Sequence, residues 1–322
     1  MKPVLCIVFC ALIRVAAAQD CTQKVPVNVL DQKTGVAITS LQPGIFQASA
    51  GKVTIPIKGL VPIERRRIVV LEDESESMAA HNTPGEYQKD AMEATDKTFT
   101  SLLSQLPLGV SVAYGFFNDK AVFTDGFFQD SHKLEEAIAT AKRQMKRPGT
   151  GDTALFDSLR EAVRLFQTPQ AGDTIVVVTD GGENKSKLGT VELEKELSTT
   201  GVRLILVLVK HPYPESPEEI EYAKWLPVLA TKTGGTTAVI DITNRSWRDP
   251  KDVTLNSAVL KEFWIQQVLS GYIMEVQVPA DSPKARKWSL RLNKTESPRL
   301  KKAILQYPEK LPSCPISTAA VH

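Results

Sequence analysis

The hydrophobic pattern changes twice along the chain and divides it into three parts. Residues 25–31 and 52–58 alternate apolar and polar side chains, which predicts strands of an antiparallel sheet with one face in water. From Arg67 onward, short apolar runs alternate with helical patterns, as is typical of a parallel sheet covered by helices on both faces. After Gly271 the period-two alternation returns. We therefore expect an α/β body and a small β module built from both ends of the chain.

The individual elements follow from the same pattern. Strands are predicted at 68–71, 110–117, 121–128, 174–178, 202–209 and 236–242, and helices at 83–106, 131–145, 153–166, 190–199, 218–232 and 253–270. The tail beyond Gly271 predicts further strands around 274–278, 288–292 and 301–307. The expected fold class is α/β, with a Rossmann-like, doubly wound, mostly parallel sheet.

The first eighteen residues differ from the rest of the chain. Lys2 is followed by the apolar run from Leu5 to Ile13 and by three alanines at 16–18, a pattern typical of a cleaved export signal. No later apolar stretch reaches the roughly 18 residues that span a bilayer, so no transmembrane segment is expected in the mature chain. We expect a periplasmic or secreted protein. Its predicted parts are a signal peptide (1–18), an N-terminal β segment (19–63), the α/β domain (64–270) and a C-terminal β segment with tail (271–322).

Charge and cysteine content narrow the classes of partner. Two of the 39 Lys and Arg residues, Lys2 and Arg14, lie in the predicted signal, so the remainder equals the 37 Asp and Glu residues. This balance gives no reason to expect a nucleic-acid partner or an anionic membrane.

Cys21 and Cys314 stay in the mature chain, and in an oxidising compartment they are expected to form a disulfide, the alternative being two free thiols.

An acid cluster follows the predicted strand at 68–71. Residues 72–77 read Glu-Asp-Glu-Ser-Glu-Ser, with four carboxylates and two hydroxyls. Like charges this close repel one another and resist leaving water, so something must offset the cost. The candidates are a bound cation, a catalytic carboxylate pair and a merely solvated acidic loop.

Two other loops carry oxygen ligands and share the predicted edge of the sheet. Thr153 stands just before a helix, and Asp180 follows the strand at 174–178. In open α/β sheets such loops meet at the carboxyl ends of the strands. If the first loop stays extended, Asp73, Ser75 and Ser77 point one way, and Glu74 and Glu76 the other. Oxygen ligands without histidine or thiolate suit Mg²⁺, Mn²⁺ or Ca²⁺ rather than zinc.

These residues resemble a known family. Asp73-x-Ser75-x-Ser77, then Thr153 in GDTALFDSL and Asp180 in TDGGEN, are similar to the metal-ion-dependent adhesion site (MIDAS) of von Willebrand factor A domains. The resemblance covers roughly residues 64–270. The flanking β segments, with Tyr307-Pro308 near the end, also resemble those of exported bacterial proteins with such domains.

The resemblance implies a metal site with a partner. Ser75 and Ser77 would bind the cation directly, Thr153 directly or through water, and Asp73 and Asp180 mostly through water. A protein ligand presenting an Asp or Glu carboxylate would fill the open position. The family usually has a small residue where this chain has Glu76. A carboxylate there could either raise cation affinity while repelling an acidic ligand or occupy the metal from within.

The sequence favours binding over catalysis. No G-x-S-x-G, H-E-x-x-H or P-loop motif occurs, and none of the four histidines belongs to a recognisable nucleophile–base pair. We expect an exported, metal-dependent binding or adhesion protein and not an enzyme. The alternative is a scaffold in which the metal only ties three loops together, and a metal-dependent hydrolase is the third hypothesis.

Overall fold

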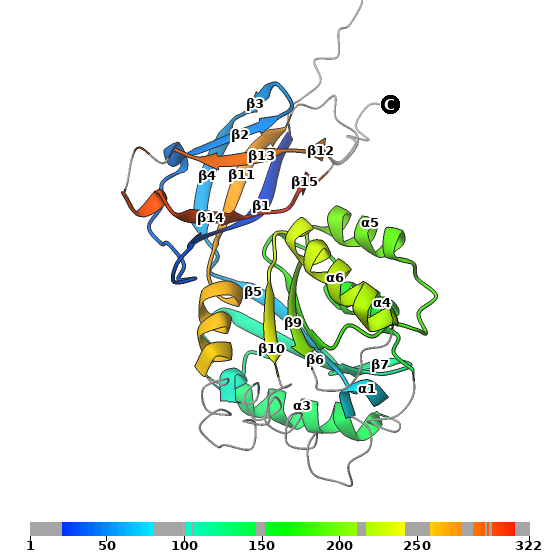
Figure 1. Cartoon of the computed structure of the whole chain (residues 1–322). Helices are drawn as coiled ribbons and strands as arrows, with labels where there is room; N and C mark the ends of the chain where they lie inside the picture. The colour runs from blue at the N-terminus through cyan, green and yellow to red at the C-terminus, as the bar shows by residue number, and fades with distance from the viewer. Residues whose placement is uncertain are drawn as a thin grey trace, which may run out of the picture.

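The computed structural model describes residues 21–79, 99, 101–104, 106–145, 152–210, 217–241, 258–278, 286–293, 295 and 298–312. They form an α/β domain and a β module above it in the view of Figure 1. In the described part of the chain, no helix is both long and apolar enough to cross a membrane. The predicted signal at 1–18 and most of the predicted helix at 83–106 lie outside the described residues.

The α/β domain is built on one six-stranded sheet in the order β10-β9-β8-β5-β6-β7. Its strands are β5 (Arg66–Asp73), β6 (Val110–Phe117), β7 (Ala121–Phe123), β8 (Thr174–Thr179), β9 (Arg203–Lys210) and β10 (Thr237–Asp241). β5 pairs in parallel with β6 on one side and with β8 on the other, and only β7 runs antiparallel to its neighbour. The predicted doubly wound α/β class is confirmed.

One strand is shorter than its apolar pattern predicts. β7 ends at Phe123, and Phe128 forms only an isolated bridge with Val112. The cause is Thr124, whose hydroxyl, and not its carbonyl, accepts the hydrogen bond from the Tyr114 N–H at 3.0 Å. The ladder therefore stops where the side chain replaces the backbone acceptor.

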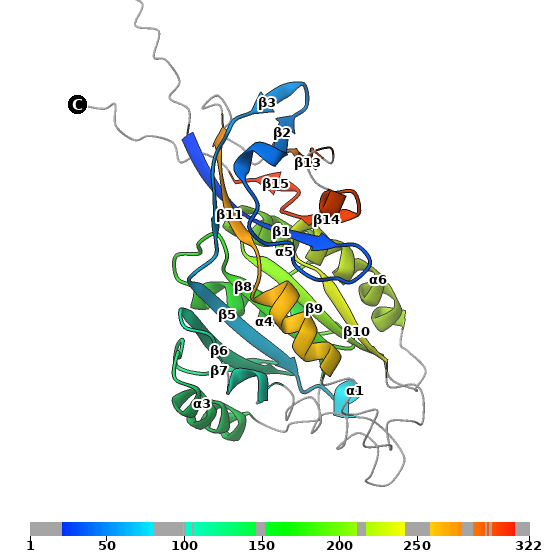
Figure 2. The ribbon, with the colours of Figure 1, turned by 90° about the vertical axis from the view of Figure 1, so that its left-hand side faces the viewer.

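Helices cover both faces of the sheet (Figure 1). One face carries α4 (Leu155–Leu165), α5 (Thr190–Thr200) and α6 (Pro217–Lys232), whose leucines pack against alternate strand residues such as Val69 and Val177. The other carries α3 (Ser131–Gln144) and the last helix, which spans residues 258–268 and is a π-helix from Trp264 to Val268. Figure 2 shows that this last helix lies across the sheet and leads into the strand β11. The predicted residues 253–257 lie outside the described part.

The β module joins the two ends of the chain. One sheet has the order β14-β1-β11-β4, with β1 (Cys21–Asp31), β4 (Ile57–Pro62), β11 (Tyr272–Val278) and β14 (Ala303–Gln306). A second has the order β13-β2-β3, with β2 (Phe46–Ala50), β3 (Val53–Ile55) and β13 (Ser289–Leu292), and β12 (Arg286–Lys287) pairs with β15 (Lys310–Leu311). β1 pairs with β11 from Cys21 opposite Val278 to Val27 opposite Tyr272, so residues about 250 apart in sequence share a third apolar core.

The predicted strand at 52–58 is in fact two strands. β3 and β4 belong to different sheets and are separated by Pro56. Proline has no N–H to give to a ladder, so the chain changes sheets there while the Pro56 carbonyl accepts from the Gln277 N–H at 2.9 Å.

The β module is docked on the edge of the parallel sheet where its strands begin. The Ile63 N–H donates to the Gly271 carbonyl at 3.1 Å, and the Glu309 N–H donates to the Lys232 carbonyl at 2.8 Å. Thr233 forms a bridge with Pro308 just beyond α6. The loops that follow β5 and β8 lie at the opposite edge, so the module leaves them uncovered.

Substitution of Gly234 tests the close packing at this junction. Its φ is +78°, and a Cβ added there would lie 2.7 Å from Pro308 N and 2.8 Å from Tyr307 C, both backbone atoms. Gly201 has a similar φ of +70° but open space around it. We expect Gly201→Ala to lower the free energy of unfolding by about 1 kcal/mol, from φ alone. Gly234→Ala should cost about 2–4 kcal/mol because it also forces the two backbones apart. Chemical denaturation measures both, and equal losses would contradict the close packing.

Candidate metal centre

The candidate site lies at the point where the strand order reverses. From β5 the chain first builds outward through β6 and β7, then returns to add β8 on the other side of β5. Helices therefore diverge from the gap between β5 and β8, and loops at their carboxyl ends form a crevice there. Asp73 ends β5, and Thr179 ends β8, with Asp180 next. Both predicted carboxylates thus stand at this switch point.

The first loop is held by Asp73 itself. One carboxylate oxygen, Oδ1, accepts from the Ser75 N–H at 2.9 Å, and the other, Oδ2, accepts from the Thr179 hydroxyl at 2.6 Å. The hydroxyls of Ser75 and Ser77 lie 3.2 Å apart. Asp73 and Ser75 are fully buried, and Ser77 is half-buried. Three of the predicted ligands therefore form one compact group.

This loop is not extended, as the alternation of its residues had suggested. β5 ends at Asp73, and a short helix, α1 (Glu76–Ala79), begins two residues after Glu74. The two serines approach each other because Ser77 already lies in the first turn of α1. Alternation along an extended strand was the wrong physical reason, although the two hydroxyls do meet.

The third loop depends on glycine. The Gly181 N–H donates to the Thr179 hydroxyl at 3.0 Å, and the Gly182 N–H donates to Asp180 Oδ1 at 2.9 Å. Gly181 has a φ of +96°, and a Cβ there would lie 3.2 Å from the Ala223 backbone nitrogen of α6. A side chain would strain this turn and press on the helix, so the sequence TDGG follows from the geometry.

The second loop is fastened to the third. The Thr153 N–H donates to Asn184 Oδ1 at 2.8 Å, while the Asn184 N–H donates back to the Thr153 carbonyl at 3.1 Å. Thr153 is buried, at 4% exposure. The N–H of the next residue, Ala154, donates to the Asn118 carbonyl at 2.7 Å, and Asn118 lies in the turn after β6. Thr153 is therefore fixed in position before α4 begins.

Together these bonds close a circuit around the crevice. The first loop joins the third through Asp73 and Thr179, and the third joins the second through Asn184 and Thr153. The second joins the end of β6 through Asn118, and the Glu74 N–H donates to the Phe117 carbonyl at 2.7 Å, which returns to the first loop. The fold thus brings the three loops that carry Asp73, Ser75, Ser77, Thr153 and Asp180 to one place.

Asp73 lies in an unfavourable environment for a charged carboxylate. Burial, followed by the negative charge of Asp180, raises the pKa of Asp73 to about 8. Asp180 is itself only 5% exposed. Burial and a neighbouring carboxylate disfavour the charged form of Asp73, and a bound cation would reverse that preference.

The neighbouring acids are directed elsewhere. Glu72 lies on the opposite face of β5, where its Oε2 accepts from the Tyr114 hydroxyl at 2.7 Å. Glu74 pairs with Lys142 of α3 at 3.4 Å, and that ammonium also lies over the Phe116 ring at 5.3 Å from its centre. Both glutamates are 2% exposed, so the solvated-loop hypothesis is wrong for this part of the cluster. The Glu76 side chain is outside the described residues.

The donor set fits a hard divalent cation. It offers two carboxylates and three hydroxyls, all oxygen, which suits Mg²⁺ or Mn²⁺ with water completing the shell. Among the described residues, no three His, Cys, Asp or Glu side chains are gathered in a metal-binding group. Such a set is what zinc or an acid-rich calcium site would need, whereas the set around Asp73 relies on hydroxyls.

The sequence of the elements that build the crevice matches a known domain family. Residues 68–183, from β5 to the loop after β8, match the von Willebrand factor type A domain. The chain carries a domain of this family. Domains of this family commonly serve adhesion or protein interaction. No curated protein matches the chain.

Solved structures with a similar fold are remote. A von Willebrand factor type A protein from Catenulispora acidiphila is 14% identical over 93% of this chain and 76% of its own, with a TM-score of 0.45. The conserved hypothetical protein BatB from Bacteroides thetaiotaomicron is 19% identical over 60% and 98%, with a TM-score of 0.40. The PilB minor pilin from Streptococcus sanguinis is 16% identical over 64% and 63%, with a TM-score of 0.41.

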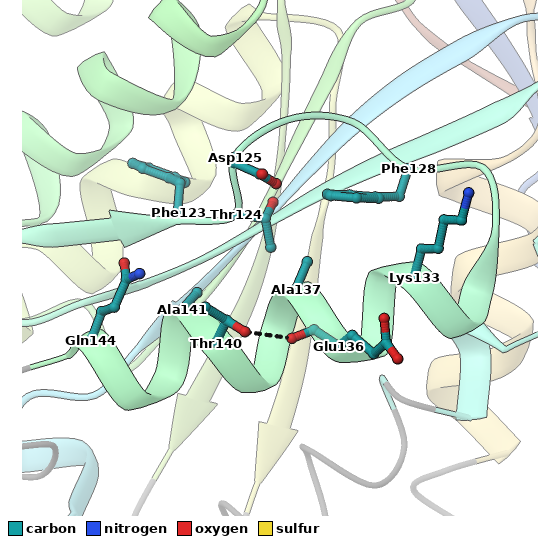
Figure 3. Close-up of a pocket in the computed structure, with 10 residues that line it drawn as sticks. All are labelled: Phe123, Thr124, Asp125, Phe128, Lys133, Glu136, Ala137, Thr140, Ala141 and Gln144. Carbon is teal, nitrogen blue, oxygen red and sulfur yellow. Dashed lines mark hydrogen bonds between the residues drawn. The ribbon is translucent and has the colours of Figure 1, made fainter.

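A separate pocket of about 450 Å³ lies between α3 and the segment after β7 (Figure 3). Phe123 and Phe128 line one side, and Glu136 and Thr140 of α3 line the other. The Thr140 hydroxyl donates to the Glu136 carbonyl at 2.9 Å within the helix. The Thr124 hydroxyl is used by the backbone of Tyr114 and Gly126. These hydroxyls serve the fold, and none of the predicted metal ligands lines the pocket.

Sequence reasoning missed the residues that hold the ligands. The metal-binding pattern gives no role to three residues of the third loop. Thr179 holds Asp73, Asn184 holds Thr153, and Glu183 holds the start of α4. Their signal was the third loop itself, TDGGEN, in which every polar side chain has a partner. Of the predicted disulfide pair, Cys21 opens β1, and Cys314 lies outside the described residues, so the bridge stays a prediction.

Glu183 is the sharpest test of the loop framework. It is 6% exposed and accepts four hydrogen bonds, from the Phe156, Lys185 and Ser186 N–H groups and the Ser186 hydroxyl. Glu183→Gln places an NH₂ group against these donors, and we expect a loss of about 2–4 kcal/mol in the free energy of unfolding. Glu161→Gln, on the exposed side of α4, is the control and should change it by less than about 0.5 kcal/mol. Urea denaturation decides, and similar losses in both variants would refute the framework role.

Proposed function

We propose that this chain is an exported binding protein that holds a partner's Asp or Glu carboxylate through one divalent cation. Mg²⁺ or Mn²⁺ would be held by Asp73, Ser75, Ser77, Thr153 and Asp180. The observation that carries the proposal is the hydrogen-bond circuit that gathers these three loops at the switch point. The crowding of Asp73 and Asp180 supports it, since a buried acid pair calls for a counter-charge.

The cation would supply an electrophilic centre with a position open to an external anion. The charges of the surrounding residues determine how electrophilic the cation would be. Hydroxyls contribute no charge. Glu72 is hydrogen-bonded to Tyr114, and Glu74 is neutralised by Lys142. The half-buried Ser77 marks the accessible side of the ligand group. This arrangement supports capture of an acidic partner rather than a catalytic role.

A structural scaffold is the second candidate function. Asp73, Ser75, Thr153 and Asp180 are at most 5% exposed, so a cation there would also tie three loops together without any partner. The two functions share the metal and differ in whether an external carboxylate completes its shell.

Magnesium titration tests the site. In calorimetry and thermal unfolding, the wild type should bind Mg²⁺ and gain stability as the cation relieves the repulsion between Asp73 and Asp180. Asp180→Ala and Ser75→Ala should weaken binding at least about tenfold. Asp152→Ala is the matched control, because this exposed carboxylate adjoins Thr153 but pairs with Lys185 at 2.7 Å. A wild type that shows neither heat nor stabilisation with Mg²⁺ or Mn²⁺ would exclude the proposed site.

Partner capture separates adhesion from scaffold. We expect immobilised wild type to retain a protein from the envelope or secreted fraction of its source in Mg²⁺ and to release it in EDTA. Asp180→Ala should lose that protein, and Asp152→Ala should keep it. If Asp180→Ala loses the metal response while its capture is unchanged, the scaffold function holds and the adhesion function does not.

A further inference from the structure

Two arginines are buried at the opposite edge of the sheet from the metal ligands. Arg66 opens β5 and is 3% exposed, and Arg203 opens β9 and is 1% exposed. Arg66 Nη1 donates to the Val268 carbonyl at 3.1 Å, and Arg203 Nη2 donates to the Gln267 carbonyl at 2.9 Å. Since these carbonyls belong to consecutive residues, both guanidinium groups lie at the C-terminal end of the last helix.

Neither guanidinium has an anionic partner among the described residues. Arg67, one position along β5, shows the usual arrangement, with its guanidinium paired to Asp173. In contrast, Arg66 Nη2 and Arg203 Nε are buried and make no hydrogen bond in the part of the chain that the structure describes. Two like charges therefore face the same helix end, and no carboxylate of the described residues pairs with either.

The charges persist at neutral pH. Burial, followed by the charge of Arg203, lowers the pKa of Arg66 to about 9, and burial lowers the pKa of Arg203 to about 10. The carbonyls at the helix end supply only about half a negative charge. Against two full positive charges this leaves a net positive centre in the core, which is strongly unfavourable without a counter-ion.

We propose that Arg66 and Arg203 hold a small inorganic anion, a halide such as chloride, at the base of the last helix. Both residues are at most 3% exposed, so the carboxylate of a partner protein has little access, and a monatomic anion is the smallest ligand that could reach the two guanidinium groups. The anion would take hydrogen bonds from the two donors that have no partner and balance the charge.

Water is the competing occupant. The Gln267 Oε1 atom is also buried without a hydrogen bond, while its Nε2 donates to the Gly35 carbonyl at 3.1 Å. A water could link this acceptor to one guanidinium, but it would leave the net charge unchanged. The two occupants differ in their response to chloride at constant ionic strength.

The site would strengthen a junction of three parts. The last helix also accepts two hydrogen bonds from the β module at Gln266. Its Oε1 accepts from the Ala37 N–H at 2.8 Å, and its carbonyl accepts from Asn28 Nδ2 at 3.3 Å. An anion on Arg66 and Arg203 would therefore fix the sheet, the last helix and the β module at one point, away from the metal ligands.

Halide dependence of thermal unfolding tests the proposal in the full chain. Sodium chloride is exchanged for sodium gluconate at constant ionic strength and constant Mg²⁺, because gluconate is too large to enter. We expect the melting temperature to rise with chloride by about 5 °C and to saturate, and bromide to act likewise. Arg203→Met should abolish the dependence, while Arg291→Met, at an exposed position of β13, should retain it. Equal melting temperatures in chloride and gluconate would overturn the proposal in favour of water.

Crystals grown in bromide give a second measurement that does not need the variant to fold. An anomalous peak between the Arg66 and Arg203 guanidinium groups is the expected result. A wild-type crystal in bromide with no such peak would refute the site.

Discussion

The parallel pairing of β5 with β8 on one side and β6 on the other is the constraint on which the rest of the structure depends. It places Asp73 at the sheet's switch point, next to the loop that follows β8, and it buries every residue of β5 apart from the partly exposed Arg67. An acid at that position cannot leave the core without breaking the central ladder. Its neighbours must therefore stabilise it, and most of the polar structure around the crevice does so.

The pleat of β5 divides the acid cluster between two environments. Glu72 and Asp73 are adjacent in sequence but point to opposite faces of the sheet. Glu72 meets the Tyr114 hydroxyl, whereas Asp73 meets Thr179 and the charge of Asp180. Glu74 leaves the sheet and is neutralised by Lys142. Four acids in five residues thus become one ion-paired carboxylate, one hydrogen-bonded carboxylate and one buried acid with a raised pKa, with Glu76 following in α1.

The sequence predicts the ligands better than it predicts their supports. Asp73, Ser75, Ser77, Thr153 and Asp180 stand at strand ends and a helix start, which periodicity locates to within a few residues. The partners Thr179, Asn184, Tyr114 and Lys142 come from elements distant in sequence. No local pattern specifies which of many threonines or lysines will lie beside a given acid. Likewise, the alternating strands at both ends predicted the β module, but the change of sheet at Pro56 and the early end of β7 at Thr124 depend on single backbone groups.

β5 begins with a buried positive charge and ends with a buried acid. The strand therefore connects the junction with the β module to the candidate metal centre. Arg66 begins the strand at the last helix and the β module, and Asp73 ends it at the candidate metal centre. The last helix is held at its C-terminus by Arg66 and Arg203 from the sheet and through Gln266 by Asn28 and Ala37 from the module. A sliding motion of this helix would break its hydrogen bonds to the sheet and to the β module. It would also leave two buried positive charges without their carbonyl acceptors. The contacts at this end therefore favour a fixed helix and a β module that is a rigid base for the crevice.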